Sequence, residues 1–348
     1  MLNITTHGNP SVTGPFASEL ILPERKRDIH GSQPRTELLE RRGLAQRYDD
    51  ATSNTPIQQL VVTTKAHHTI KALLPLRHRL SKNSTLLFLQ NGCGTIEEVN
   101  QHVFPDPSER PHYMVGINSH GVHATGPASA VHAGHGVIYI GALEYNQTAG
   151  NHSARLRNRR SDAGSDELQL PDTSRYLLRS FTHLPILAAL PVPPSTLTLH
   201  QLDKLAVNCV VNPLTVLLDA PNGSILNNHN LSRTMRLLLF EISAIFRRLP
   251  EVQGIPNIDV RFSPDRLEDM VVSVARKTGE NISSMLQDVR RGVETEIDYL
   301  NGWVVRRGEA VGVKAVVNYS MVTLVKGKQN MISREVEGWS PFEGRGRL

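Results

Sequence analysis

The chain has few cysteines and no long apolar run. Among its 348 residues, Cys93 and Cys209 are the two cysteines, and neither lies in a metal-ligand spacing. Two such cysteines make no disulfide framework, which favours a reducing compartment. No apolar stretch approaches the roughly 20 residues that span a bilayer, and residues 1–8 show neither a signal-peptide core nor the early arginines of a transit peptide. We expect a cytoplasmic protein without membrane association, with the mitochondrion as the alternative.

A strong charge of one sign is also missing. The formal net charge of +5 is mild for this length. The dense basic clusters at 25–27 and 155–160 fall in predicted loops, where solvated charge is the simpler interpretation than a nucleic-acid surface. The 15 histidines are scattered and form no HExxH or Cys/His pattern. We therefore predict no nucleic-acid partner and no metal site.

What the chain does contain is the composition of a globular protein, with 39% hydrophobic and 20% charged residues. Its length is enough for two domains. From residue 59 short apolar strands alternate with helices, which is typical of a parallel sheet with helical crossovers. The predicted strands are 60–64, 85–89 and 114–117, and the predicted helices are 69–80, kinked at Pro75, and 96–102. Residues 131–133 and 137–140, on either side of Gly134-His135-Gly136, are predicted to form a hairpin.

The second half of the chain reads as helical. Residues 146–173 form a polar, biased segment that we predict to be a disordered insertion, and the proline-rich 190–194 is a natural domain link. Helices are expected at 176–181, 201–218, 231–249, 264–279, 281–290, 294–308 and 317–327. The predicted fold is an α/β Rossmann-like N-terminal domain (1–195), incomplete at its start, followed by an all-helical C-terminal domain (196–330) and a tail (331–348). A ligand would lie between the domains, at the carboxyl ends of the strands.

A polar stripe crosses the predicted helix at 201–218. Lys204, Asn208 and Asn212 are spaced at i, i+4 and i+8, which puts all three on one helix face among apolar neighbours. One ammonium and two carboxamides suit an anionic, oxygen-rich small molecule. The alternative is a helix with one polar edge facing solvent, and spacing alone does not decide between them.

Several blocks of sequence surround this stripe in a characteristic order. They are Lys204–Thr215 with Pro221-Asn222-Gly223, then Asn281–Asp288, then Thr295–Gly302 followed by Arg306-Arg307, with Thr64-Lys65-Ala66 and Asn91–Glu98 upstream. Over roughly residues 57–328, apart from a gap near 146–175, the chain resembles the ketopantoate reductases (2-dehydropantoate 2-reductases). The resemblance implies NADPH-dependent reduction of a small 2-keto acid, 2-dehydropantoate, to pantoate for pantothenate and coenzyme A synthesis. A homodimer is compatible with it.

The resemblance also implies roles for individual residues. Lys204 matches the catalytic lysine, which polarises the ketone and supplies a proton, and Glu296 matches the acidic residue beside that lysine and the nicotinamide ribose. Cofactor contacts are implied for Lys65, Asn91, Glu296 and, through its backbone, Val122. Substrate contacts are implied for Asn208, Asn212, Asn222, Asn281, Ser283 and Ser284. Without the resemblance, Asn222 would be read as turn chemistry and the group 281–284 as helix capping.

The glycine fingerprint of dinucleotide-binding folds is not in the sequence. The family opens with a strand and G-x-G-x-x-G, which places the pyrophosphate on a helix N-terminus. Neither residues 7–14 nor Gly134-His135-Gly136 have that spacing. Two alternatives stay open: a shortened version of an active reductase, or a divergent member that no longer binds NADPH and acts as a small-acid or protein-binding module.

Overall fold

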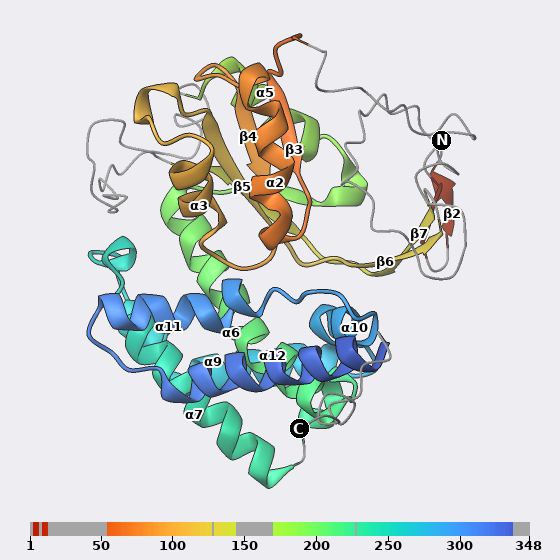
Figure 1. Cartoon of the computed structure of the whole chain (residues 1–348), viewed down its shortest axis with the longest axis vertical. Helices are drawn as coiled ribbons and strands as arrows, with labels where there is room; N and C mark the ends of the chain where they lie inside the picture. Colours follow the sequence, from red (N-terminus) through yellow and green to blue (C-terminus); the bar gives the residue numbers. More distant parts are fainter. Residues whose placement is uncertain are drawn as a thin grey trace, which may run out of the picture.

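The computed structural model describes residues 54–126, 129–143, 170–226 and 228–336, together with the backbone of two short strands at 3–6 and 9–12. Figure 1 shows a sheet domain above a domain made of helices. A single helix, α6 (Pro194–Leu218), leaves the sheet domain and runs into the helical one. The predicted order, a Rossmann-like domain followed by a helical domain, is confirmed.

The main sheet has five strands in the order β3-β4-β5-β8-β9. Strands β3, β4 and β5 are parallel, β8 is antiparallel to β5, and β9 is parallel to β8. Their bounds are Gln59–Val62, Thr85–Phe88, His112–Asn118, Ile138–Ala142 and Ala189–Pro191. The three parallel strands are those predicted from the apolar runs.

Alternate side chains of this sheet enter different cores. Leu86 and Phe88 pack with α2, η2 and α3, whereas Leu87 and Met114 pack with α5 on the opposite face. Burial on both faces explains why β4 is a continuous apolar run. The covering elements are α2 (Thr69–Leu73), η2 (Leu74–Arg79), α3 (Thr95–His102) and α5 (Asp172–Thr182). Pro75 lies in the first turn of η2, where the α-helix of the predicted 69–80 segment gives way to a 3-10 helix.

The predicted hairpin of 131–133 with 137–140 is wrong. Strand β7 (Ser129–Gly134) pairs antiparallel with β6 (Gly121–Gly126), and β8 pairs with β5. The two predicted arms thus belong to different sheets, the second having the order β2-β1-β7-β6 with β1 (Asn3–Thr6) and β2 (Asn9–Val12). A Cβ on Gly136 would lie 2.4 Å from the carbonyl carbon of Ser119, so the chain here passes against the end of β5 instead of folding back on β7.

The helical domain contains α6 to α12. Their bounds after α6 are α7 His229–Phe246, α8 Ile258–Arg261, α9 Pro264–Lys277, α10 Ser284–Arg290, α11 Asn301–Ala310 and α12 Val316–Val336. Short 3-10 turns lie at Ala66–His68, Pro107–Glu109, Pro185–Leu187, Asn222–Ile225, Pro250–Val252 and Ile297–Tyr299 (η8). The Ser263 side chain caps α9, which begins at the first residue of the predicted 264–279 helix. No helix in the described ranges is both long and apolar enough to cross a bilayer.

Two predicted boundaries differ from the structure. Helix α6 begins at Pro194, inside the predicted domain link, because proline is tolerated in the first turn of a helix. Helix α12 runs past residue 330 to Val336. Most of the predicted insertion lies outside the described residues, but its end is ordered, since α5 begins at Asp172.

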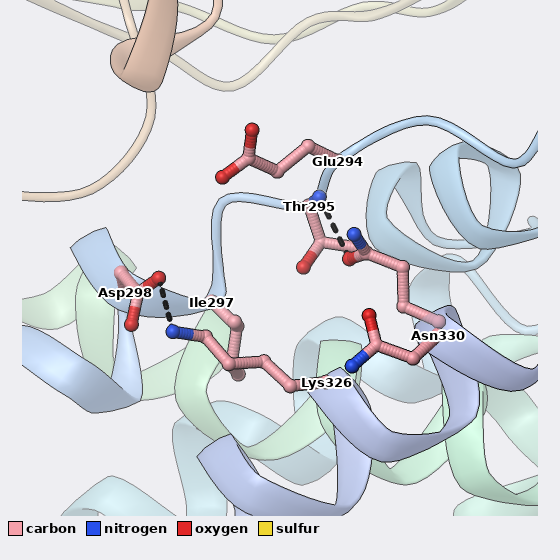
Figure 2. A pocket seen from close by; sticks show the side chains of 7 residues that line it. Glu294, Thr295, Ile297, Asp298, Lys326 and Asn330 are labelled. Atoms are coloured by element: carbon pink, nitrogen blue, oxygen red, sulfur yellow. Dashed lines mark hydrogen bonds and ion pairs between the residues drawn. The ribbon is translucent and has the colours of Figure 1, made fainter. Parts of the chain in front are cut away.

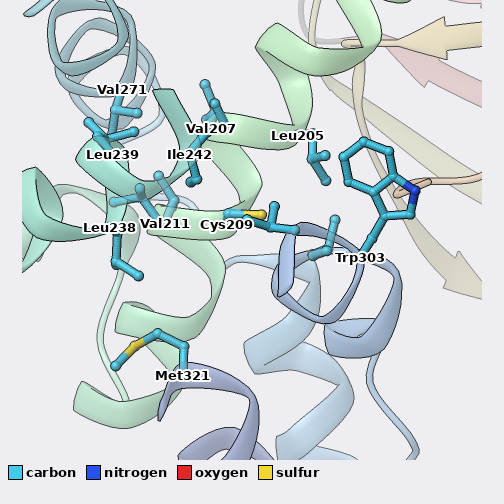
Figure 3. Packing of buried hydrophobic residues seen from close by; sticks show 14 of the residues in the cluster. Leu205, Val207, Cys209, Val211, Leu238, Leu239, Ile242, Val271, Trp303 and Met321 are labelled. Carbon is cyan, nitrogen blue, oxygen red and sulfur yellow. The ribbon is translucent and has the colours of Figure 1, made fainter. Parts of the chain in front are cut away.

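Helix α6 ties the two domains together. Near its start Leu197 packs on Val115 and Ile117 of the sheet, whereas its later turns are the centre of the large helical core shown in Figure 3. Pro213 lies within α6 and has no N–H to donate to the Cys209 carbonyl. The buried Asn301 side chain donates to that carbonyl instead, at 2.9 Å, so the helix continues through the proline.

Candidate active site

The parallel strands bring three polar residues to one edge of the sheet: two predicted site residues and one further asparagine. Lys65 and Asn91 follow β3 and β4, and Asn118 ends β5. Contacts from all three strand ends reach the helical domain: Lys65 to Asp288, Cys93 N–H to Tyr299, and the Asn118 carbonyl to Lys204. The site is therefore the junction between the carboxyl edge of the sheet and the helical domain.

Lys204 reaches from α6 to the end of β5. Its side chain is only partly exposed, and its Nζ donates to the Asn118 carbonyl oxygen at 2.6 Å. Burial lowers the pKa of Lys204 to about 8, while the negative charge of Glu296 acts in the opposite direction. An ammonium with this pKa is charged at neutral pH and is a much stronger acid than an ordinary lysine.

Glu296 is buried beside the end of β3. Its Oε1 accepts from the Ala66 backbone N–H at 3.0 Å, and its Oε2 lies 3.5 Å from Lys65 Nζ. No hydrogen bond joins this carboxylate to the Lys204 ammonium. Glu296 acts on Lys204 through its charge and is itself oriented by the segment after β3.

Asp288, the last residue of the block at 281–288, joins this cluster, although no role was predicted for it. Its Oδ2 accepts from Lys65 Nζ at 2.7 Å, and the carboxylate is buried. Burial raises the pKa of Asp288, against the pull of Lys65. Burial lowers the pKa of Lys65, but Glu296 and Asp288 outweigh it and the net shift is upward. One partly exposed ammonium thus serves two buried carboxylates.

The loop that carries Glu296 is fastened to α12. A pocket of about 230 Å³ lies beside this loop, and Figure 2 shows the side chains that line it. Thr295 N–H donates to Gln329 Oε1 at 3.1 Å, and Asp298 pairs with Lys326 at 2.7 Å. These bonds fix the residues on both sides of Glu296. The pocket is therefore lined by residues that help to position the Glu296 carboxylate. Lys204 and the candidate asparagines do not line it.

The asparagines of the stripe lie along α6 below Lys204. Asn208 is half-buried and Asn212 is buried, and the side chain of neither bonds to any residue in the described ranges. Asn222, also buried, donates from Nδ2 to Thr278 Oγ1 at 3.0 Å, while its Oδ1 is buried with no partner. A buried carbonyl oxygen without a donor is costly, so a donor that reached this atom would be stabilising.

The group at 281–284 divides into different roles. The Ser283 hydroxyl accepts from Leu286 N–H at 3.1 Å as the N-cap of α10 and bonds to Thr215 Oγ1 at 2.7 Å. The capping alternative is thus realised at Ser283. Asn281 is exposed, with its carbonyl accepting from Asn222 N–H at 2.9 Å, and Ser284 is exposed in the first turn of α10.

The turn after β4 is docked on the helical domain. Gly92 has φ +83°, and a Cβ there would lie 2.6 Å from the Tyr299 carbonyl oxygen, so glycine is required on both counts. Asn91, the residue before it, is half-buried at the sheet edge. Val122 instead lies on β6 with its side chain 55% exposed, away from any packed core.

The described residues hold no group of three or more histidine, cysteine, aspartate or glutamate side chains placed to bind a metal ion. The polar atoms gathered at the junction are an ammonium of lowered pKa, buried carboxylates and carboxamides. This set suits proton transfer to an oxygen of a small acid.

Comparison with known proteins identifies the family. Residues 25–145 match the model of ketopantoate reductase PanE/ApbA, and residues 196–329 match that of its C-terminal domain. The probable 2-dehydropantoate 2-reductase of Schizosaccharomyces pombe is 31% identical over 274 residues, covering 78% of this chain and 74% of that protein. The chain belongs to the ketopantoate reductase family.

Solved structures agree. The probable 2-dehydropantoate 2-reductase panE of Bacillus subtilis superposes with a TM-score of 0.56 at 26% identity, over 79% of each chain. A ternary structure of D-mandelate dehydrogenase with NADH and anilino(oxo)acetate superposes with a TM-score of 0.61 at 18% identity, over 81% of this chain and 80% of that one. The second likeness shows a shared fold.

Proposed function

We propose that this ketopantoate reductase family member reduces 2-dehydropantoate to pantoate with NADPH, in the synthesis of pantothenate and coenzyme A. The observation that carries the proposal is Lys204, an ammonium whose pKa is lowered to about 8 at the junction of the domains. Its bond to the Asn118 carbonyl aims it along the sheet edge where Lys65 and Asn91 also lie. The family relationship supplies the substrate.

Lys204 is the proposed proton donor. A reduced nicotinamide, when bound, supplies the hydride to the ketone carbon. The Lys204 ammonium would polarise the ketone oxygen during this transfer and give it a proton as the alcohol forms. Glu296 favours the charged form of Lys204, which is the form that can do this. Burial favours the neutral amine, so the proton is easily given up.

The substrate grip is proposed for the asparagines below Lys204. Asn208 and Asn212 present unbonded carboxamides for a carboxylate or hydroxyl. The unpartnered Oδ1 of Asn222 can accept from the substrate hydroxyl. Of the loop residues, Ser284 and Asn281 are free to contact a ligand, whereas the Ser283 hydroxyl is already used by the α10 cap.

The residues present fit the nicotinamide half of the cofactor. Lys65, Asn91 and Glu296 lie at the carboxyl ends of parallel strands, and β6 presents the backbone at Val122. The NADH of the D-mandelate dehydrogenase structure supports a nicotinamide as the class. For the pyrophosphate the sequence has no G-x-G-x-x-G.

We assign cofactor binding to the domain at 1–195 and substrate binding to that at 196–330. A cytoplasmic location and a homodimer stay predictions.

The test is a spectrophotometric assay on the whole chain, after circular dichroism shows it to be folded. NADPH and NADH are each supplied with 2-dehydropantoate or with 2-oxo-3,3-dimethylbutanoate, which lacks only the hydroxyl. We expect oxidation of NADPH with 2-dehydropantoate and a much higher KM for the analogue. Folded protein that neither binds nor oxidises either cofactor would favour the non-catalytic small-acid or protein-binding alternative.

A further inference from the structure

The carbonyl that receives Lys204 belongs to a turn pinned on several sides. The turn, Asn118-Ser119-His120, joins β5 to β6. His120 N–H donates to Asn118 Oδ1 at 2.8 Å. Ser119 N–H donates to the Val137 carbonyl at 3.0 Å, and Val137 N–H donates to Ser119 Oγ at 2.8 Å. These bonds fix the position of the Asn118 carbonyl, and none of them involves Lys204.

The His120 ring has bonds that define its tautomer. Gly136 N–H lies 3.0 Å from Nδ1, and an amide can only donate, so Nδ1 carries a lone pair. The Leu187 carbonyl oxygen lies 2.8 Å from Nε2 and can only accept, so Nε2 carries the proton. His120 is the neutral Nε2–H tautomer, and a second proton on Nδ1 would face the Gly136 N–H.

The neighbouring His132 completes the arrangement. Its Nε2 lies 2.9 Å from His120 Nδ1, so a proton on Nε2 would share the single Nδ1 lone pair with the Gly136 N–H. His132 is buried, and burial, followed by the His120 and His135 rings, lowers the pKa of His132. A neutral His132 can still make this bond through its Nε2–H.

These bonds span a place where two segments touch. Because a Cβ on Gly136 would meet the Ser119 carbonyl carbon, the 136–137 segment lies directly against the turn. The His120 ring links this segment to Leu187, just before β9. The His120 side chain thus connects the turn to the residues just before β8 and to those just before β9.

We propose that His120 is a positioning residue for Lys204: its neutral ring holds the turn in the place where the Asn118 carbonyl receives the ammonium. His120 touches neither Lys204 nor, on this account, the substrate, and it acts through the carbonyl. The proposal rests on the role of Lys204 as proton donor.

The first test separates the two bonds of the ring by substitution. His120→Asn keeps an acceptor near Nδ1 for Gly136, His120→Gln keeps a donor near Nε2 for Leu187, and His120→Phe keeps neither. With NADPH and 2-dehydropantoate we expect His120→Phe to lower kcat by about 10- to 100-fold, the scale of a small misplacement of a reacting group, with KM for NADPH little changed. His120→Asn should recover most of that loss, because the Gly136 bond holds the close contact.

The matched control is His135→Phe. His135 is the exposed member of the same histidine cluster, with its ring 4.5 Å from that of His132. The same change there should leave kcat and KM at wild-type values. Equal losses in His135→Phe and His120→Phe would overturn the proposal in favour of general disturbance of the cluster.

The second test needs no turnover. Nitrogen-15 NMR of the wild-type protein should show His120 with its proton on Nε2, and the Lys204 ammonium, assigned by its loss in Lys204→Met, as a protected signal. In His120→Phe that ammonium signal should broaden or vanish. An inactive wild type with these signals would reject the reductase function and keep the positioning role. A His120 proton on Nδ1, or an unchanged Lys204 signal and kcat in His120→Phe, would overturn the proposal.

Discussion

Lys204 Nζ donates to the carbonyl oxygen of Asn118, 86 positions earlier in the chain, at 2.6 Å. This bond joins α6, the first helix of the helical domain, to the end of β5 in the sheet. It holds an ammonium, whose pKa burial has lowered to about 8, at the edge of the sheet where Lys65 and Asn91 also lie.

The rate should fall on the alkaline side near pH 8. The proton donor must be charged, and the folded pKa of Lys204 lies below its ordinary value of 10.5. Activity is therefore retained below pH 8 and should fall about tenfold per pH unit above it. The measurement is kcat for 2-dehydropantoate reduction between about pH 6 and 10. A flat profile through pH 10 would remove Lys204 from the role of acid.

Replacing Glu296 by glutamine should move the alkaline limb of the pH–rate profile, where kcat falls, to lower pH. The Glu296 charge raises the pKa of Lys204 against burial, so its removal leaves burial unopposed. Glutamine retains an oxygen for the Ala66 N–H, which preserves the local backbone. The control is Glu294→Gln, two residues away with a side chain 60% exposed. We expect a shifted limb and lower kcat at pH 8 in Glu296→Gln alone; equal profiles would contradict the coupling.

Removing the Lys65 ammonium should destabilise the protein through the carboxylates it leaves behind. Lys65→Met exposes Asp288 and Glu296 to each other's charge in a buried site, at a cost of roughly 1–3 kcal/mol in the free energy of unfolding. Burial already raises the pKa of Asp288, so the folded state holds its proton more tightly than the unfolded state. Stability of the variant should therefore fall as pH rises from about 4 to 7.

Urea unfolding of Lys65→Met, Asp288→Asn and the double variant gives the coupling between the two side chains. The double variant should be more stable than Lys65→Met, since one of the two stranded charges is gone. A double variant whose loss equals the sum of the single losses would show that the pair contributes nothing.

Asn222 and Ser283 should respond differently to alanine. Asn222 has a buried Oδ1 with no partner, so Asn222→Ala should raise KM for 2-dehydropantoate by about tenfold, the worth of one hydrogen bond. Ser283 caps α10, so Ser283→Ala should lower the free energy of unfolding by about 1 kcal/mol with little change in KM. Kinetics and thermal unfolding of both variants would distinguish the roles, and the reverse pattern would exchange them.

Local pattern was enough to predict the parallel strands and most helices. Leu86–Phe88 are apolar because β4 is covered on both faces, and Ser263-Pro264 is a capped helix start. The hairpin around Gly134 was wrong because pairing depends on the partner that space offers, and β5 offered one to β8. Gly134 and Gly136 are compatible with a hairpin turn and also with the observed path from β7 to β8.

Of the candidate site, the spacing of residues in the sequence could predict only the groups that share one local element. Lys204, Asn208 and Asn212 share a helix, so their stripe follows from the period of 3.6 residues. The contacts that set their chemistry join distant segments: Lys65 meets Asp288 across 223 positions, and Glu296 meets Ala66 across 230. No local pattern signals such pairs, and Asp288 and His120 were passed over for that reason.

The most direct test of the account compares wild type with Lys204→Met in 2-dehydropantoate-dependent NADPH oxidation, with both proteins shown to be folded and with NADPH binding measured for each. We predict saturable turnover in wild type, and in the variant a loss of kcat of at least about 100-fold with NADPH affinity unchanged. Turnover by Lys204→Met near the wild-type rate, or folded wild-type protein that binds NADPH yet leaves 2-dehydropantoate untouched, would contradict the assignment of Lys204 as the acid of a ketopantoate reductase.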